Sequence, residues 1–255
     1  MNDKLVGLEF PEPGLAILSL QRAEKRNALN IALLEQLIGA MEQLAQHADS
    51  RVIILRGEGS VFCAGLDLIE ANNPDVAERS ADGVRRVLSL LRESPLIVIG
   101  AAVGAAYAGG AGLLAACDLV VAADDFHLGF PEVRRGLVAA MVSNVLVRKI
   151  SVGALSELLL LGEPITAERA RQMGLIQWIV PSGQVLESSL NVARKILAGG
   201  PQAVRETKQL INREPATFDL ESLQALHERI RHSAEAREGF AAFLDRREPN
   251  WCQKS

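Results

Sequence analysis

The sequence predicts an α/β protein whose last part is entirely helical. As far as Pro181, short apolar segments alternate with segments of helical periodicity, a pattern typical of strands alternating with helices. After Pro181, every periodic segment has helical spacing. We therefore divide the 255 residues into a strand-and-helix core, 1–195, and a C-terminal helical region, 196–255.

The strands of the core are expected where short apolar segments lie between turn residues. The first follows Pro13-Gly14 and the second ends at Gly57. We expect strands at 15–20, 52–55, 96–100, 119–122 and 175–180, with a short extended piece at 126–130.

The helices of the core are expected where apolar residues recur at helical spacing. Asn30 is a good N-cap for the first helix, and Asp67, at the end of a turn over 60–67, can cap a short second one. We expect further helices at 31–44, 83–91, 111–116, 133–150, 151–161 and 167–172. In the C-terminal region we expect helices at 185–197, 203–211 and 220–246, separated by Pro201 and Pro215.

The run from Leu96 to Cys117 contains no charged residue and is long enough to be considered a transmembrane helix. It contains five glycines and follows Pro95, which favours a buried strand, a turn and a buried helix. The N-terminal MNDKLVGLEF lacks the basic start and apolar core of a signal peptide. We therefore expect a cytoplasmic protein without a membrane segment.

The composition excludes several classes of function. Apolar residues make up 49% and charged residues 23%, as in soluble globular proteins. A net charge of −4 argues against a nucleic-acid partner. The three cysteines (Cys63, Cys117 and Cys252) are odd in number and lack metal-ligand spacing, so we expect a reduced compartment and no metal site. Apolar surroundings should make Cys63 and Cys117 inert.

The same apolar run, followed by Phe130-Pro131-Glu132, indicates chemistry. Glycines can place bare backbone N–H groups beside a ligand, and one carboxylate downstream can transfer a proton. Together these groups could stabilise and protonate an enolate. The alternative for the glycines is that they only allow close packing. The alternative for Glu132 is a solvated position on the surface. Against a solvated Glu132, Pro131 fixes the backbone, and apolar neighbours could raise the pKa of Glu132.

Three motifs carry a resemblance to a known family: QRAEKRNALN at 21–30, FCAGLDL at 62–68, and the segment from Gly104 to Leu137. In this order they resemble the crotonase family, also called the enoyl-CoA hydratase/isomerase family. The resemblance extends to 161–181 and to the tail ending in FLDRREP. It implies a spiral of ββα units, a homotrimer or dimer of trimers, and an acyl-CoA thioester as substrate. Coenzyme A is then part of the substrate, and no cofactor is expected.

The resemblance also implies a site. The N–H groups of Leu66 and Gly109 are expected to stabilise the thioester enolate, with Glu132 as acid and base. Two-glutamate hydratases carry another glutamate where this chain has Gly112. Its absence favours 3,2-enoyl-CoA isomerisation, but hydration stays open because some family hydratases acting on aromatic acyl-CoAs keep only the second acid.

Further residues are expected to contact the substrate. Arg22, Lys25, Arg26 and Lys208 could meet the phosphates of coenzyme A. By motif position, Arg26 and Ala64 are the strongest candidates, and Asp67 lies in the same motif as Ala64. Leu66 replaces a small residue of many members, which could change the acyl pocket. Tyr107 could line that pocket or simply pack.

Two other classes of function remain as alternatives. One is a non-catalytic or RNA-binding homologue, which the acidic balance disfavours. The other is a hydrolase or dehalogenase on the same scaffold, which needs a nucleophilic aspartate or a histidine base. No such group is apparent: Asp124 and Asp125 are expected in a solvated turn, and His127 should face away from Leu128 and Phe130.

Overall fold

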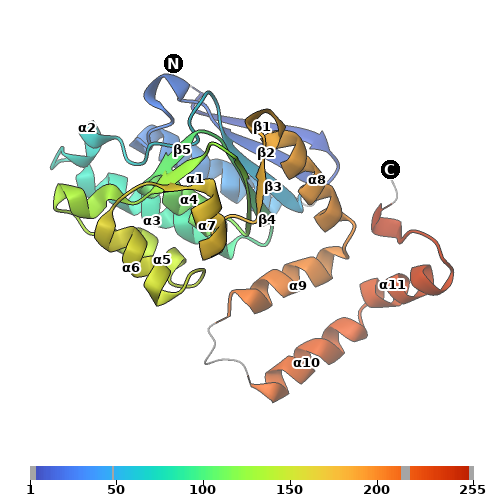
Figure 1. The fold of residues 1–255 in the computed structure, drawn as a ribbon. Coiled ribbons are helices and arrows are strands. Elements are labelled where there is room, and N and C mark those ends of the chain that lie inside the picture. The colour runs from blue at the N-terminus through green and yellow to red at the C-terminus, as the bar shows by residue number, and fades with distance from the viewer. Residues whose placement is uncertain (1–3, 48, 214–218, 253–255) are drawn as a thin grey trace.

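The computed structural model describes residues 4–47, 49–213 and 219–252 (Figure 1). Its strands are β1 (Val6–Glu12), β2 (Leu15–Leu20), β3 (Val52–Gly57), β4 (Ile97–Ala102), β5 (Ala105–Tyr107), β6 (Leu119–Ala123), β7 (His127–Gly129), β8 (Ile165–Thr166) and β9 (Trp178–Val180). Within the described residues they form a larger sheet of order β1-β2-β3-β4-β6-β9 and a smaller one of order β5-β7-β8. In the larger sheet, β1 and β2 pair antiparallel and all later pairs are parallel.

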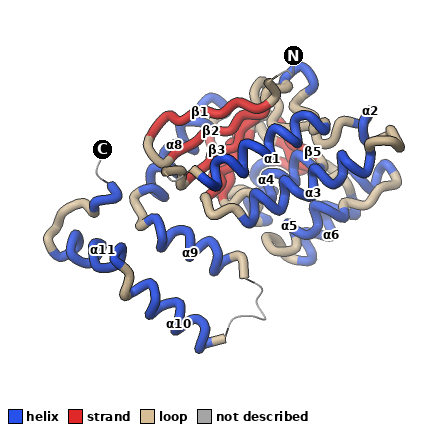
Figure 2. Tube along the Cα trace, turned by 180° about the vertical axis from the view of Figure 1, so that it is seen from behind, coloured by secondary structure: helices blue, strands red, loops and turns tan. Residues whose placement is uncertain are grey.

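The helices of the core are α1 (Ile31–Gln46), α2 (Leu68–Ala71), α3 (Ala77–Glu93), α4 (Gly109–Ala116), α5 (Ala140–Leu146), α6 (Val152–Leu161), α7 (Ala167–Met173) and α8 (Val185–Leu197). Short 3₁₀ helices are η1 (Ala23–Lys25), η2 (Pro131–Arg135) and η3 (Ser182–Gln184). Helix α8 packs against β3, β4 and β6. Figure 2, seen from behind, brings α1 and α3 to the front, where they pack against each other.

The strands expected at 15–20, 52–55, 96–100 and 119–122 are confirmed as β2, β3, β4 and β6. Nearly all of their residues are buried, which explains their continuous apolar sequences. Strands β1 and β5 are not indicated by the sequence pattern, because β1 is a partly exposed edge strand and β5 spans only AAY. Of the strand expected over 175–180, only Trp178–Val180 forms.

The single helix expected over 133–150 is wrong. The chain forms η2, and Gly136 then ends it in the left-handed region, at φ 71°. Helix α5 begins only at Ala140. The helix expected over 220–246 is likewise two helices, α10 (Leu220–Arg231) and α11 (Ala234–Leu244), because Ser233 caps α11 by accepting a hydrogen bond from Ala236 N.

The carboxyl ends of the parallel strands lie at one edge of the larger sheet. The register pairs Leu20 with Gly57 and Arg56 with Ala101, so β2, β3 and β4 end at nearly the same level. The loops that follow these strands therefore leave the sheet side by side. In open α/β sheets this edge is where ligands bind, and it carries all three motifs of the sequence.

The C-terminal helices α9 (Pro201–Ile211), α10 and α11 stand apart from the sheet (Figure 1). Pro201 is the first residue of α9, as expected for a proline that begins a helix, and Pro215 lies outside the described residues. The Glu235 carboxylate of α11 accepts from Gln202 N at 2.7 Å and Ala203 N at 2.8 Å, which joins α11 to α9. A final 3₁₀ turn, η5, spans Asn250–Cys252. Among the described helices, none combines the length and the apolarity that crossing a membrane requires.

Candidate active site

Three segments far apart in sequence are joined at the carboxyl edge of the sheet. The buried side chain of Asn27 donates to the carbonyls of Glu58, Val61 and Phe62, over 2.8–3.1 Å. Isolated parallel bridges pair Leu29 with Leu66 and Cys63 with Ala106. The first motif is thereby fixed to the FCAG loop, and that loop to the strand before α4.

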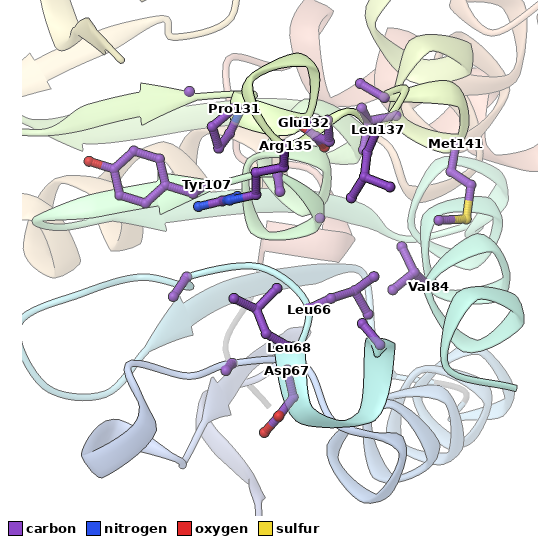
Figure 3. A pocket seen from close by; sticks show the side chains of 18 of the residues that line it. Leu66, Asp67, Leu68, Val84, Tyr107, Pro131, Glu132, Arg135, Leu137 and Met141 are labelled. Carbon is purple, nitrogen blue, oxygen red and sulfur yellow. The ribbon is translucent and has the colours of Figure 1, made fainter. Parts of the chain in front are cut away.

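A cavity of about 780 Å³ opens between these segments and η2. Figure 3 shows two walls, one carrying Tyr107, Pro131, Glu132 and Arg135, the other carrying Leu66 and Leu68. Much of the lining is apolar, so the cavity suits a ligand with a substantial apolar part.

The backbone N–H groups of Leu66 and Gly109 come together in this cavity. An added Cβ on Gly109 would lie 4.0 Å from the Leu66 nitrogen. Among the described residues, no hydrogen bond is formed by the Leu66 N–H. Gly109 is the first residue of α4, where N–H groups have no intrahelical partner and the helix dipole favours negative charge. Two backbone donors are thus available to an anionic ligand atom.

The glycines around α4 have different roles. A Cβ on Gly110 would lie 2.4 Å from the Cys63 carbonyl oxygen, so Gly110 allows close packing. A Cβ on Gly109 would make only ordinary contacts, the nearest 3.4 Å from Leu29 Cδ1. Packing therefore explains Gly110 but does not require a glycine at 109, where the missing side chain leaves the N–H open to the cavity.

Glu132 places a carboxylate in the wall of the same cavity. It is the second residue of η2, after Pro131, and its backbone carbonyl accepts from Leu137 N at 3.0 Å. Its Oε2 is buried and, among the described residues, has no hydrogen-bond partner. Burial raises the pKa of Glu132, against smaller opposing effects of its own backbone N–H and the Arg135 cation. An unpartnered carboxylate with a raised pKa is suited to accept and return a proton.

The space beside Gly112 is filled by apolar side chains. A Cβ on Gly112 would lie 2.6 Å from Val142 Cγ1 of α5 and 3.5 Å from Leu88 Cδ2 of α3. A second acid could not occupy this position unless Val142 moved. The other carboxylates that line the cavity are Glu24, which is exposed, and Asp67.

Most of the residues expected to contact coenzyme A line the cavity. Arg26 and Ala64 are adjacent, because Ala64 N donates to the Arg26 carbonyl at 2.9 Å. Asp67 caps α2 by accepting from Ile69 N and also pairs with Arg22 at 2.7 Å. The charge of Arg22 is therefore already partnered. Lys25 and Arg26 are exposed at the cavity.

Lys208 does not lie at the cavity, which corrects its expected place beside the coenzyme A phosphates. It is 5% exposed, and its Nζ donates to Asp118 Oδ2 at 2.7 Å and to the Leu96 carbonyl at 2.8 Å. Asp118 also accepts from Val98 N at 2.7 Å. Lys208 thus joins α9 to the sheet, and its donors are directed at protein acceptors.

The remaining candidates fall into two groups. Tyr107 lines the cavity, whereas His127 is exposed on β7 with Leu128 and Phe130 buried, as the alternation predicted. Asp124 and Asp125 are exposed in a turn. Burial raises the pKa of each thiol, Cys63 and Cys117, to about 12, which keeps both in the unreactive protonated form.

Sequence reasoning missed three residues that shape the site: Asn27, Arg135 and Val142. Asn27 has φ 53°, in the left-handed region. Asparagine adopts this region more readily than most residues, so an asparagine inside a motif is a recognisable sign of a special backbone position. The position of Arg135 could have been inferred only from the short η2. Val142 carries no local signal, because its contact with Gly112 depends on how α5 packs on α4.

Comparison with known proteins gives a consistent result. The family model described as "Enoyl-CoA hydratase/isomerase" matches residues 11–254. An enoyl-CoA hydratase of Mycobacterium tuberculosis is 34% identical over 248 residues, with 92% of each chain covered. The 2,3-dehydroadipyl-CoA hydratase of Escherichia coli is 32% identical over 239 residues, covering 92% of this chain and 94% of that protein.

The fold has close counterparts among solved structures. The enoyl-CoA hydratase of Bacillus anthracis matches with a TM-score of 0.91 and 32% identity, covering 96% of this chain and 98% of that one. An enoyl-CoA hydratase of Mycobacterium smegmatis gives a TM-score of 0.91 at 29% identity, covering 98% and 100% of the two chains. The expected fold class, an α/β core with a C-terminal helical region, is confirmed.

Proposed function

The chain belongs to the enoyl-CoA hydratase/isomerase family, the crotonases, and we propose that it transfers protons on acyl-CoA thioesters with Glu132 as its single acid and base. The observation that carries the proposal is the buried, unpartnered Oε2 of Glu132 in the cavity that also holds the Leu66 and Gly109 N–H groups. The thioester oxygen would lie between the two donors, and the carbon next to the thioester would face Glu132.

The Leu66 and Gly109 N–H groups would stabilise the negative charge that develops during the reaction. When a proton leaves the carbon next to the thioester, negative charge develops on the thioester oxygen. Backbone N–H groups held in place stabilise that charge without reorganising, and one such donor is worth on the order of 3 kcal/mol. Coenzyme A enters this scheme as part of the substrate, with Arg26 and Ala64 at the cavity as its proposed contacts.

The reaction that this site supports best is 3,2-double-bond isomerisation. The Glu132 carboxylate takes a proton from carbon 2 of a 3-enoyl-CoA, and the electron pair moves to the thioester oxygen. The protonated Glu132 returns the proton to carbon 4, and the double bond is left between carbons 2 and 3. One carboxylate suffices for both steps, which agrees with Val142 and Leu88 filling the space beside Gly112.

Hydration of a 2-enoyl-CoA is the second candidate, favoured by the names of the relatives in Mycobacterium tuberculosis and Escherichia coli. Glu132 would then accept a proton from a water molecule that adds at carbon 3, and would return a proton to carbon 2. The water would have one carboxylate partner in place of two. Because an apolar wall cannot hold it through hydrogen bonds, we place hydration second.

Incubation with 2-enoyl-CoA and 3-enoyl-CoA in separate reactions tests the order of these candidates. An isomerase converts 3-enoyl-CoA to 2-enoyl-CoA, seen as a gain of conjugated-enoyl absorbance, and forms no 3-hydroxyacyl-CoA. Loss of absorbance from 2-enoyl-CoA with formation of 3-hydroxyacyl-CoA would reverse the order. Turnover of neither thioester would contradict the proposed function as a whole.

We also propose that the chain assembles as a homotrimer or a dimer of trimers. Apolar side chains of α11 are exposed in the single chain, with Phe243 82% and Leu244 78% exposed. Side chains of this size are expected to be covered. Sedimentation equilibrium would give the mass of three or six chains, and a monomeric mass would contradict this proposal.

A further inference from the structure

Arg135 places a positive charge on the same wall of the cavity as Glu132. Both residues belong to η2, in which side chains three positions apart are eclipsed and therefore project from the same side. Arg135 lines the cavity, and its charge acts on the Glu132 carboxylate through space. Figure 3 shows the Arg135 side chain beneath Pro131 and Glu132, with its guanidinium pointing along the same wall toward Tyr107.

This guanidinium is available to a ligand. Arg135 is exposed and, among the described residues, forms neither a hydrogen bond nor an ion pair within 4 Å, whereas the unpartnered Oε2 of Glu132 is buried. Its neighbour Arg134 differs, since it pairs with Glu163 at 2.6 Å, donates to the Leu161 carbonyl at 2.9 Å and does not line the cavity. Adjacent arginines thus have different surroundings, one directed at protein acceptors and the other at the cavity.

The surroundings of Arg135 indicate what it would bind. The cavity is also lined by apolar side chains: Leu66, Leu68, Val84, Leu137, Val138, Met141 and Val142. These can hold the methylene groups of an acyl chain, whereas the exposed Arg135 guanidinium offers a partner to an anionic group on that chain. Arginine presents a planar fork of N–H donors that matches a carboxylate. The phosphates of coenzyme A have other cations, Lys25 and Arg26, on the segment that carries η1.

We propose that Arg135 binds a carboxylate on the acyl chain of the substrate, so that the enzyme prefers ω-carboxyacyl-CoA thioesters to acyl-CoA thioesters ending in a methyl group. The inference rests on the proposed function and names its substrate class. It also has an electrostatic reason: a substrate carboxylate near Glu132 would meet a like charge, and a cation beside both relieves that repulsion. The free guanidinium is the feature that makes an anionic acyl chain acceptable in this cavity.

Binding of saturated thioesters tests this without requiring turnover. Glutaryl-CoA and pentanoyl-CoA share a five-carbon acyl chain and the same phosphates, and differ in the terminal carboxylate. Their dissociation constants are measured by isothermal titration calorimetry for the wild type and for Arg135→Leu, Arg135→Lys and Arg134→Leu. The wild type should prefer glutaryl-CoA by about tenfold or more, as expected for a charge-assisted hydrogen bond. Arg135→Leu should lose that preference, Arg135→Lys should keep part of it, and Arg134→Leu should keep it in full.

Two results would overturn the inference. One is equal binding of the two thioesters by the wild type. The other is an Arg135→Leu variant that weakens both to the same extent, because an arginine that contacts a coenzyme A phosphate or only supports the fold acts on both alike. Should Arg135→Leu fail to fold, the wild-type preference and its change in Arg135→Lys decide the question. Turnover of a neutral enoyl-CoA by the wild type tests the proposed function separately.

Discussion

At the scale of single residues, the site depends on how the chain holds Glu132. Pro131 fixes the backbone just before it, and the turn of η2 directs its carboxylate into the cavity. Burial, with no hydrogen-bond partner for Oε2 among the described residues, raises its pKa. An ion pair at this position would have lowered the pKa and made the carboxylate a poor base.

The raised pKa predicts the pH dependence of activity. Because the base must be ionised, kcat/KM should rise with pH and reach half its plateau above pH 4.5, the ordinary pKa of glutamate. Arg135→Leu removes a cation that lowers this pKa and should move the midpoint to higher pH, whereas Arg134→Leu should leave it in place. A pH–rate profile of the three proteins checks this. A midpoint at or below 4.5 in the wild type would contradict it.

The resemblance to the family implies the pair Leu66 and Gly109, and the structure brings these two together with Glu132. The expected place of Lys208 beside the phosphates is wrong, because a lysine in a polar helical segment shows no sign of burial in the sequence. Lys208 is buried because Asp118 and the Leu96 carbonyl lie opposite it, and those acceptors belong to other elements. Local patterns cannot reveal such a partnership.

At the scale of elements, the packing of α4 on α5 limits the chemistry of the site. Gly112 of α4 faces Val142 of α5 so closely that even a Cβ would be 2.6 Å from Val142 Cγ1. Val142 is 3% exposed and has little room to move. The side chain of Val142 therefore occupies the space that a second acid at position 112 would need.

This contact predicts an interaction between substitutions. Gly112→Glu should lower the free energy of unfolding by about 1–3 kcal/mol, since extra atoms are forced into a packed contact. Val142→Ala should also destabilise the fold by removing buried methyl groups, but in the double variant it makes room for the glutamate. The double variant should be more stable than the sum of the two effects predicts, by about 1 kcal/mol. Urea unfolding of the four proteins measures this, and strictly additive effects would argue against direct contact.

The elements themselves were predictable to different degrees. The buried strands β2, β3, β4 and β6 were found because parallel strands covered on both faces are continuously apolar. The spacing of apolar residues on both sides of Gly136 predicts one helix over 133–150, whereas the structure interrupts it at Gly136. A glycine there is compatible with helix interruption but does not require it, and the fold decides.

At the scale of the whole molecule, a buried ion pair attaches the C-terminal helices to the core. Lys208 of α9 pairs with Asp118, which directly precedes β6 and also accepts from Val98 N of β4. Burial raises the pKa of Asp118, although the Lys208 cation opposes this. The predicted division of the chain at residue 195 falls inside α8, so this pair is one of the contacts that join the two parts.

Lys208→Met should therefore affect stability more than binding. Removing one member of a buried pair costs about 3 kcal/mol, because the other is left unpaired. The loss should grow as the pH rises through the raised pKa of Asp118, since below that pH the carboxyl is protonated and neutral. Thermal unfolding at several pH values checks this, with exposed Lys195→Met as the control. Weaker acyl-CoA binding with unchanged stability would instead support a role beside the phosphates.

The architecture as a whole was predictable because motif order and spacing survive along the entire chain, and the family match over 11–254 agrees. Contacts between distant segments were not predictable from the sequence. Only the assembled fold shows that Asn27 joins its loop to the FCAG loop and that Arg135 lies at the cavity. These juxtapositions depend on contacts between residues distant in sequence, for which a single sequence carries no direct signal.

The central claim is that Glu132 is the single acid and base, and Glu132→Gln tests it most directly. The amide keeps the shape of the side chain but cannot exchange a proton at working pH. We predict that kcat on the enoyl-CoA substrate falls by about 10²–10⁴, while the dissociation constant for a saturated acyl-CoA stays within about threefold of the wild type. Asp124→Asn, in an exposed turn, serves as the matched control and should retain full activity. Turnover near the wild-type rate in Glu132→Gln would contradict the account.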